Sequence, residues 1–330
     1  PPNKDIRWEK TTTVNVGVDF ALFRHRLSGT IEYYNKYSVD LLAAINGSPT
    51  QGFGYTTLMT NNGKMVNRGV EITLSGEIIR QKDFSWNASL LYAFNRNKVK
   101  HISVQPSLWD SRISMPTSYP MVGKPLYGIY AYKWAGLNEN GDPQVYDAEN
   151  NVTSGPARDY HALVYCGTTV PIHNASLTNV LRYKGFEFSA MLILDAGHKL
   201  RSSNIPSINM SNGRITSTAK GIVDRWTQPG DVTDVPRLLF SNDTENFNTH
   251  RTELYRYSDL FVYDASNIRL SNISLAYRVP AHWCKKISLS GARLQFNVEN
   301  VATFAFDSKA NYDLGGKVKP NYVWGLYLNF

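Results

Sequence analysis

The sequence contains no hydrophobic run long enough to form a membrane-spanning helix. Such a helix needs about 18 consecutive apolar residues, and the most apolar stretches, 89–94 and 190–194, are far shorter. Charged residues are also sparse, at 19% of the 330 residues, although apolar residues reach 42%. The composition excludes a helical membrane protein, and the chain contains no low-complexity tract or linker that would separate domains.

Cysteine is nearly absent, since Cys166 and Cys284 are the only two and lie far apart. The number excludes a disulfide-rich scaffold, the lack of a CxxC pair excludes a zinc site of that kind, and both suit an oxidising cell envelope. The net charge is +8, but lysine and arginine are scattered, with no basic run beyond residues 24–26. We therefore expect no nucleic-acid partner. The first residues lack a signal-peptide layout, so an exported protein would contain this chain as a fragment.

Patterns of catalytic and metal-binding residues are missing as well. The seven histidines have no metal-ligand spacing, and neither a Gly-x-Ser-x-Gly elbow nor a phosphate-binding loop occurs. Residues 138–142 have some likeness to a calcium loop, yet their Asn-Gly pair first indicates a β-turn. We predict that the chain is not an enzyme and binds no metal and no cofactor.

The strongest pattern that is present is an alternation of apolar and polar residues with a period of two. In 14–22, for example, Val14, Val16 and Val18 alternate with polar or small residues, which is the pattern of a β-strand with one apolar face. Near Ser271 and Asn272 the apolar phase changes, which predicts a β-bulge. The predicted strands are 13–23, 27–42, 66–80, 84–101, 175–183, 186–197, 267–279, 287–300 and 322–330.

Three features favour a membrane-spanning barrel over a soluble β-sandwich, whose strands also alternate. The strands are longer than the usual five or six residues, and the polar face carries charges on successive strands, which suits a water-filled lumen. The connections are either tight or very long, as in outer-membrane barrels. The tight ones are 24–26, 81–83 and 184–185, and the long ones lie near 43–65, 102–174, 199–264 and 301–321.

The predicted fold class is therefore all-β, a transmembrane antiparallel β-barrel with short periplasmic turns and long outer loops. If the tight connections are all periplasmic, the first and last strands both run toward the periplasm, so the number of spanning strands is odd. Nine strands satisfy this condition, and an additional strand at 126–137 would violate it. We predict one partial barrel domain over residues 1–330, with 102–174 and 199–264 as extracellular excursions and a short helix around 222–226. The alternative is a further strand hidden within 102–174.

The phase of the alternation assigns side chains to the two faces of this sheet. The residues predicted to face lipid are Leu27, Ile31, Ile72, Phe84, Trp86, Leu192, Phe296 and Leu328. The lumen-facing candidates are Glu32, Tyr34, Glu71, Glu187 and Arg293. Aromatic residues in the excursions are substrate-contact candidates, with packing of loop against loop as the alternative. They are Trp109, Tyr119, Trp134, Tyr146, Tyr160 and Trp226.

Five segments, in order along the whole chain, resemble SusC/RagA-type TonB-dependent outer-membrane transporters. They are 6–11 with 17–20, 67–71, Trp134 with 136–142, 181–186 and 264–277. Each motif is short, but five in the same order are specific. The resemblance implies that the chain forms the last nine strands of a 22-stranded barrel whose N-terminal plug domain and earlier strands are absent here.

The same resemblance implies TonB-dependent import of large nutrients, either glycans or oligopeptides, across the bacterial outer membrane. The implied partners are a SusD-like lipoprotein on the outer face, TonB through the missing plug segment, outer-membrane lipid, and a second transporter–lipoprotein pair in a dimer. A passive or adhesive outer-membrane barrel and a soluble carbohydrate-binding all-β module are the alternatives. Nothing in the residues selects glycan over peptide.

The last six residues resemble the assembly signal of outer-membrane proteins. Gly325 is followed by the apolar Leu328 and the aromatic Phe330 at plus three and plus five. A terminal strand must be recognised by the barrel-insertion machinery before it closes the barrel, so its edge has to remain available for pairing. The alternative is an ordinary amphipathic last strand.

Overall fold

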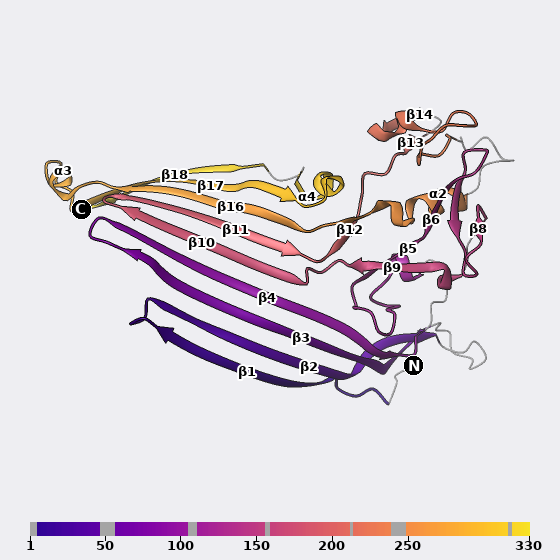
Figure 1. The fold of residues 1–330 in the computed structure, drawn as a ribbon, viewed down its shortest axis with the longest axis horizontal. Coiled ribbons are helices and arrows are strands. Elements are labelled where there is room, and N and C mark those ends of the chain that lie inside the picture. The colour runs from indigo at the N-terminus through magenta and orange to yellow at the C-terminus, as the bar shows by residue number, and fades with distance from the viewer. Residues whose placement is uncertain are drawn as a thin grey trace.

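The computed structural model describes residues 5–46, 57–104, 111–155, 159–211, 214–238, 249–315 and 319–330. One antiparallel sheet of nine strands dominates it, in the order β1-β2-β3-β4-β10-β11-β16-β17-β18 (Figure 1). The number of strands confirms the prediction. The sheet is open, with β1 and β18 at its edges. The bounds are Lys10–Leu22 (β1), Leu27–Asn46 (β2), Thr57–Arg80 (β3), Phe84–Ile102 (β4), His173–Tyr183 (β10), Phe186–Ala196 (β11), Asn267–Arg278 (β16), Gly291–Ala305 (β17) and Asn321–Asn329 (β18).

The two ends of the sheet differ in their connections. The tight connections, together with 279–290, which contains the short helix α3 (Ala281–Lys285), lie at the end where the C-terminus also lies (Figure 1). We call this the turn end. The opposite end, the loop end, carries the long stretches between β4 and β10 and between β11 and β16. The last strand therefore ends on the side of the tight turns, as the parity argument requires.

Strand register places the apolar residues on one face of the sheet. Directly opposite residues of neighbouring strands point to the same side, so each row of partners belongs to one face. One such row is Val18, Ile31, Ile72, Tyr92, Ala175, Leu194 and Ile268, and another is Trp86, Leu181, Phe188, Leu275, Phe296 and Trp324. All eight residues predicted to face lipid share this apolar face.

The apolar face has little protein cover, since Ile31 is 45%, Leu294 50% and Trp324 78% exposed. An uncovered apolar surface of this extent is the mark of a membrane or partner interface. That its neighbour is lipid remains a prediction. The other face, here called the polar face, carries the row Gly17, Glu32, Glu71, Ala93, Asn174, Asp195 and Asn267.

The bulge predicted near Ser271 and Asn272 is confirmed. Pairing of β16 with both neighbouring strands passes from Leu270 to Asn272, so Ser271 has no opposite partner. The extra residue restores the apolar phase, because Ile268 and Leu270 lie on the same face as Ile273.

The predicted strand ends were wrong toward the loop end. β2 and β3 remain paired as far as Asn46 and Thr57, so 43–65 is not a long loop. β17 likewise runs to Ala305 at the loop end, whereas at the turn end it begins at Gly291 rather than at 287, since residues 281–285 form α3 and residues 286–288 form a turn. The physical reason is that backbone pairing continues where neither face has to be apolar, so the alternation ends before the strands do.

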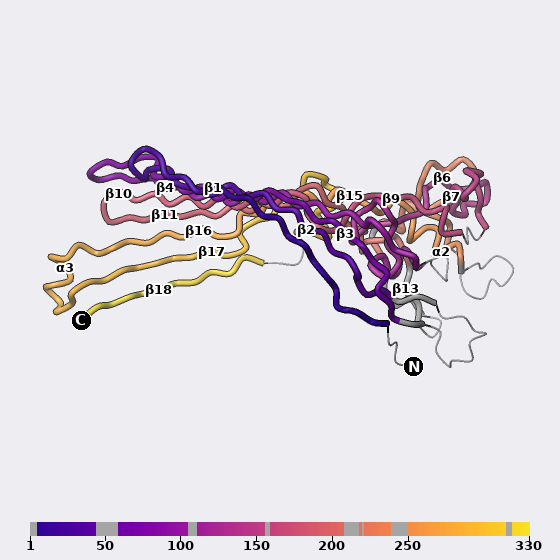
Figure 2. The backbone as a smooth tube through the Cα atoms, turned by 90° about the horizontal axis from the view of Figure 1, so that it is seen from below, coloured from indigo at the N-terminus to yellow at the C-terminus, as the bar shows by residue number. Residues whose placement is uncertain are grey.

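At the loop end the long stretches fold into small elements that lie together (Figure 2), here called the loop assembly. Its strands pair as β5 with β9, β6 with β7 and β8, β12 with β15, and β13 with β14, and none of the described strands joins the large sheet. This confirms that 126–137 adds no spanning strand. The strands are Gly128–Tyr132 (β5), Trp134–Leu137 (β6), Pro143–Tyr146 (β7), Val152–Thr153 (β8), Leu163–Thr168 (β9), Lys199–Arg201 (β12), Ile208–Ser211 (β13), Arg214–Thr218 (β14) and Val262–Asp264 (β15).

The described helices are all short, and none is long and apolar enough to cross a membrane. The helix expected around 222–226 is a 3-10 helix at Lys220–Asp224, two residues earlier. The others are α1 (Ser111–Ser114), α2 (Thr249–Arg256) and α4 (Asn311–Gly315), with 3-10 turns at Tyr160–Ala162, Asp259–Phe261 and Ser308–Ala310.

A hydrophobic core lies in the loop assembly rather than under the sheet. Its buried members come from both long stretches, which are therefore packed against each other. They are Tyr130, Tyr132, Val145, Ala162, Leu163 and Leu254. Because burial of large apolar side chains is the main stabilising term in folding, the loop assembly is a packed structure in its own right.

Candidate ligand-binding site in the loop assembly

Asp142 ties three segments of the loop assembly together. Its Oδ1 accepts hydrogen bonds from Arg237 Nε at 3.1 Å and Arg251 Nε at 2.6 Å, and its Oδ2 accepts one from Arg237 Nη2 at 2.9 Å. Arg251 also donates to the backbone carbonyl of Arg237. Hydrogen bonds between charged groups of this kind are about twice as strong as neutral ones. They hold the 138–142 turn against Arg237 and Arg251, which lie 95 and 109 positions from Asp142 in the sequence.

The 138–142 segment is a turn, as the Asn-Gly pair predicted. Asn138 Oδ1 accepts hydrogen bonds from the backbone N–H of Asn140 at 3.0 Å and of Asp142 at 2.9 Å. The carboxylate that a calcium loop would need is bound to the two arginines instead. Within the described residues, no group of three or more histidine, cysteine, aspartate or glutamate side chains is arranged to hold a metal ion.

The charge of Asp142 makes this tie sensitive to pH. Burial pushes the pKa of Asp142 upward, but hydrogen bonds from Arg237 and Arg251 outweigh it, so the pKa lies below its ordinary value. A carboxyl whose pKa is depressed in the folded state stabilises that state above the ordinary value of about 4. The contribution is lost as the pH falls through the lower, folded-state pKa.

We expect Asp142→Asn to loosen the loop assembly while the sheet stays intact. Hydrogen bonds to charged groups contribute about 1.5–3 kcal/mol in stability, and the variant weakens three of them. Limited proteolysis of the folded protein should cleave the loop assembly faster at neutral pH, and acidification below pH ~4 should no longer add to the effect. The control is Asp147→Asn, which alters an exposed turn whose Oδ1 accepts from Asn151 N–H at 2.7 Å. Equal cleavage rates in the two variants would contradict the role of Asp142.

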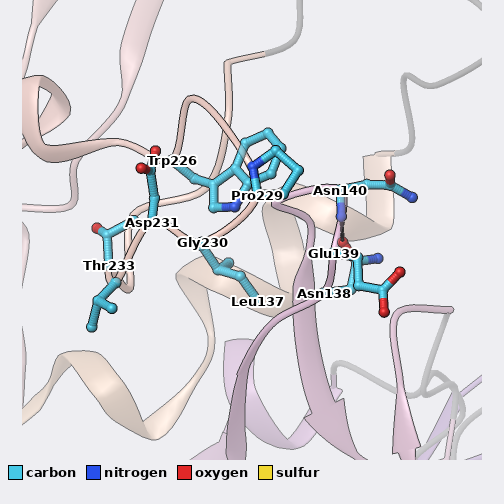
Figure 3. A pocket seen from close by; sticks show the side chains of 10 residues that line it. Leu137, Asn138, Glu139, Asn140, Trp226, Pro229, Gly230, Asp231 and Thr233 are labelled. Atoms are coloured by element: carbon cyan, nitrogen blue, oxygen red, sulfur yellow. Dashed lines mark hydrogen bonds between the residues drawn. The ribbon is translucent and has the colours of Figure 1, made fainter.

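A pocket of about 750 Å³ opens beside this tie, between residues 137–140 and the turn at 226–233 (Figure 3). Asp231 shapes the second turn, because its Oδ2 accepts from Thr227 N–H at 2.8 Å, Thr227 Oγ1 at 2.7 Å and Gln228 N–H at 3.0 Å. These hydrogen bonds lower the pKa of Asp231 and keep it ionised. The pocket volume lies in the range of small-ligand sites.

Trp226 forms part of the pocket wall and packs on the 138–142 turn. A Cβ added to Gly141 would overlap the Trp226 indole, and Gly141 has a φ of +73°. Both the close approach and the left-handed backbone therefore require glycine at this position. The turn and the indole consequently form one unit, which Asp142 connects to Arg237 and Arg251.

The pocket offers one aromatic surface and several polar groups. In Figure 3, Asp231 and Thr233 approach from one side and Asn138 and Glu139 from the other. An indole provides a flat apolar surface for C–H groups and rings, while carboxylates and amides bind hydroxyl or N–H donors. This arrangement suits an uncharged or cationic polar ligand such as a sugar or a peptide backbone.

The structure divides the aromatic candidates into two groups. Trp226 lines the pocket, whereas Trp134 packs on Tyr255 with ring centroids 5.7 Å apart and donates from Nε1 to Asp234 Oδ1 at 2.9 Å. Tyr160 lies under the guanidinium of Arg112 at 4.9 Å.

Two other aromatic candidates contact basic residues of the loop assembly, and the third lies outside the described residues. Tyr146 has the Lys133 ammonium over its ring at 4.7 Å, and Tyr119 is half-buried and accepts from Arg112 through its carbonyl. Trp109 lies outside the described residues. For Trp134, Tyr160 and Tyr146 the contacts are those of loop packing, the alternative raised by the sequence.

The lumen-facing candidates all lie on the polar face, in two groups. Glu32 and Glu71 are directly opposite each other in β2 and β3. Tyr34 is the next residue of β2 on the polar face toward the loop end, and its Oη donates to Asn95 Oδ1 at 3.1 Å. The Tyr34 ring covers Gly69, at which any side chain would overlap it.

Glu187 and Arg293 form the second group, toward the turn end. Glu187 accepts from Arg182 Nε at 2.7 Å and from Arg293 Nη2 at 3.1 Å, so one carboxylate is shared by two arginines. These groups are far from the pocket along the sheet, and the structure does not bring them together with Trp226.

Several residues of the site escaped the sequence reasoning. Arg237 and Arg251 have no local pattern that shows their common partner, Asp142. Residues Pro229, Gly230 and Asp231 form a Pro-Gly-Asp sequence that is typical of a turn. That this turn forms a pocket wall could be predicted only with knowledge of the segment that packs against it.

An open antiparallel sheet with one uncovered apolar face, tight turns at one end and a packed loop assembly at the other is the architecture of a membrane β-barrel segment. The family model described as "TonB dependent receptor-like, beta-barrel" matches residues 1–301. The chain therefore belongs to the TonB-dependent receptor-like β-barrel family, a family of receptors and transporters.

Comparisons with individual proteins agree with this assignment. The chain is 25% identical to TonB-dependent receptor P3 of Formosa agariphila over 98% of its own length, and 25% identical to TonB-dependent receptor SusC of Bacteroides thetaiotaomicron over 90%. It spans 33% and 29% of these relatives, about a third of their length. The solved structure titled "Structure of the RagAB peptide transporter" has a similar fold, with a TM-score of 0.75 at 23% identity, covering 100% of this chain and 36% of that one.

Proposed function

We propose that this chain is the C-terminal barrel portion of an outer-membrane transporter that imports glycans or oligopeptides in a TonB-dependent manner. The observation that carries the proposal is the match of residues 1–301 to the receptor barrel family. The loop assembly supports it, because it places a pocket with the Trp226 indole in its wall at one end of the sheet. In the proposed placement in the outer membrane, the turn end faces the periplasm and the loop end faces the outside of the cell.

The proposed partners follow from the relatives. TonB would act on a plug segment supplied by the rest of the transporter, and a SusD-like lipoprotein would cover the loop end, with two such pairs in a dimer. The apolar face would contact outer-membrane lipid, and the polar face would line the lumen with Glu32, Tyr34, Glu71, Glu187 and Arg293. The barrel-insertion machinery would read the last strand through Gly325, Leu328 and Phe330.

The test measures uptake by cells whose chromosomal copy of the transporter gene is deleted and which carry the gene on a plasmid. Growth is measured on a casein digest and on a mixture of plant oligosaccharides, each as the sole carbon source. We expect the wild-type gene to restore growth on one of the two substrates, and inactivation of TonB to abolish it. Growth that persists without TonB would indicate a passive barrel and refute the proposal.

Trp226→Ala should weaken ligand binding at the loop end. Loss of an aromatic contact costs about 1 kcal/mol, which corresponds to a roughly fivefold weaker affinity and a higher substrate concentration for half-maximal growth. The matched control is Trp283→Ala, because Trp283 is 55% exposed in α3 at the turn end. Equal effects of the two substitutions would show that the pocket does not contact the substrate.

A further inference from the structure

A group of basic side chains lies on the loop-end side of the apolar stretch of β3 and β4. On the apolar face Asn35, Arg68 and Arg96 form one row across β2, β3 and β4, and Lys98 lies in the next row, opposite Val66. Arg68, Arg96 and Lys98 are exposed. Lys124 lies beside them, because residues 123–124 hydrogen-bond to the backbone of Val99 at 2.8 and 2.9 Å. These four residues, Arg68, Arg96, Lys98 and Lys124, are here called the basic collar.

Protein contacts do not account for the charge of the basic collar. Arg68 and Arg96 are direct cross-strand partners, and like charges in that position destabilise a sheet. Arg68 Nε donates to Asn35 Oδ1 at 3.0 Å, a contact that orients the side chain without neutralising it. Among the described residues, no carboxylate lies within 4.0 Å of any of the four cations.

The position of the basic collar matches the surface of a bilayer. On β4 the apolar face runs from Phe84 to Phe94, a distance of ten residue steps or about 34 Å along the strand. With a strand tilt of about 40° this is a height of about 26 Å, close to the ~25 Å apolar band of outer-membrane barrels. Phe94 is the last apolar residue of β4 on this face and lies in one row with Tyr33, in the place of an interfacial aromatic girdle. Arg96 is the next residue of β4 on that face.

Space for a ligand group exists next to these cations. Arg96 and Lys124 line a cavity of about 140 Å³ together with Tyr165 and Pro171. The Lys124 ammonium lies 4.8 Å from the centroid of the Tyr165 ring, which keeps the charge beside the cavity.

We propose that the basic collar binds the phosphate groups of an outer-leaflet lipid; the inference rests on the membrane placement given under the proposed function. Guanidinium groups bind phosphate oxygens through paired, charge-assisted hydrogen bonds. A phosphate between Arg68 and Arg96 turns their mutual repulsion into a shared attraction, while the acyl chains lie on the adjacent apolar face. The lipid is thereby held at one place on the barrel wall, over β3 and β4.

The test compares purified full transporter and its R68Q/R96Q variant in nanodiscs of uncharged glycolipid. Fluorescent diphosphorylated lipid A and its enzymatically dephosphorylated form are titrated into each sample. Each cation near a membrane surface strengthens anionic lipid binding about fivefold, so we expect the variant that lacks two cations to bind the phosphorylated lipid about thirtyfold more weakly. The dephosphorylated lipid should bind both proteins equally weakly.

Two controls separate this proposal from other outcomes. K36Q removes a cation at almost the same height but on the polar face, since Lys36 is opposite Asn67, and it should leave lipid binding unchanged. Single R68Q and K98Q variants, each checked for heat-modifiable folding, cover the case in which the double variant does not fold. Millimolar inorganic phosphate should not displace the lipid; displacement at that concentration would mean a site for free phosphate and overturn the proposal.

The two proposals can fail separately. Equal binding of phosphorylated and dephosphorylated lipid A by the wild-type protein would overturn the role of the basic collar and leave the transporter intact. If the wild-type protein did not enter lipid nanodiscs at all, the membrane placement and with it the proposed function would be refuted.

Discussion

Leu192→Arg should destabilise the folded barrel by about 2–4 kcal/mol, the cost of placing an arginine near the middle of the lipid-facing surface of an outer-membrane barrel. Leu192 lies on the apolar face of β11, between Leu177 of β10 and Leu270 of β16. Neither neighbour offers a negative charge, so the guanidinium would lie against hydrocarbon. The measurement is reversible unfolding of the full transporter in lipid vesicles by denaturant.

The matched control for this substitution is Ser189→Arg in the same strand. Ser189 lies on the polar face, opposite Val180 and Ser274, where we expect water to hydrate an added charge. We expect a change of less than about 0.5 kcal/mol, as for most surface substitutions. If both positions tolerated arginine equally well, the assignment of the apolar face to lipid would be wrong.

Deletion of Phe330 should reduce the amount of assembled barrel in cells severalfold, with little change in the stability of the barrels that do form. Phe330 is 92% exposed and follows Leu328 on the apolar side of β18. Burial of a phenylalanine side chain contributes about 1.5–3 kcal/mol, a loss that a large barrel tolerates. We expect recognition of the last strand by the insertion machinery to have no such reserve, because the strand has to pair there before the barrel closes.

Heat-modifiable folded protein in the outer membrane measures assembly, and the melting temperature of the inserted fraction measures stability. Phe306→Ala is the control, since Phe306 is an exposed aromatic residue (61%) beyond the loop end of β17. A normal yield of folded protein after deletion of Phe330 would show that the last strand carries no assembly signal.

The alternation of residues was sufficient to predict the sheet. A membrane-spanning strand has lipid on one face and water on the other, so its side-chain period of two appears in the sequence without help from distant residues. The number of strands, the face of every predicted lipid-facing residue and the bulge at Ser271 were all readable in this way. The same reasoning failed beyond the predicted strand ends at 42 and 66, where β2 continues to Asn46 and β3 begins at Thr57 and an apolar face is no longer needed.

The candidate ligand-binding site was predictable in part. The sequence identified the aromatic residues of the loops as candidates and left open whether they bind ligand or pack. Trp134 and Trp226 look alike in that respect, and they differ because Trp134 meets Tyr255 and Asp234 while Trp226 lies at the wall of the pocket.

The residues alone determined the all-β class, the two faces of the sheet, the tight turns and the odd number of strands. These features follow from the sequence because each face of a strand has one uniform environment along its length. What only the tertiary structure decided depends on pairs of segments far apart in the chain. Packing of the loops produces the hydrogen bonds of Asp142 with Arg237 and Arg251 and the pocket between 137–140 and 226–233. Strand register produces the row of Arg68 and Arg96. The physical reason is that lipid imposes a periodic pattern on a strand, whereas a loop is stabilised by particular partners, which no local pattern records.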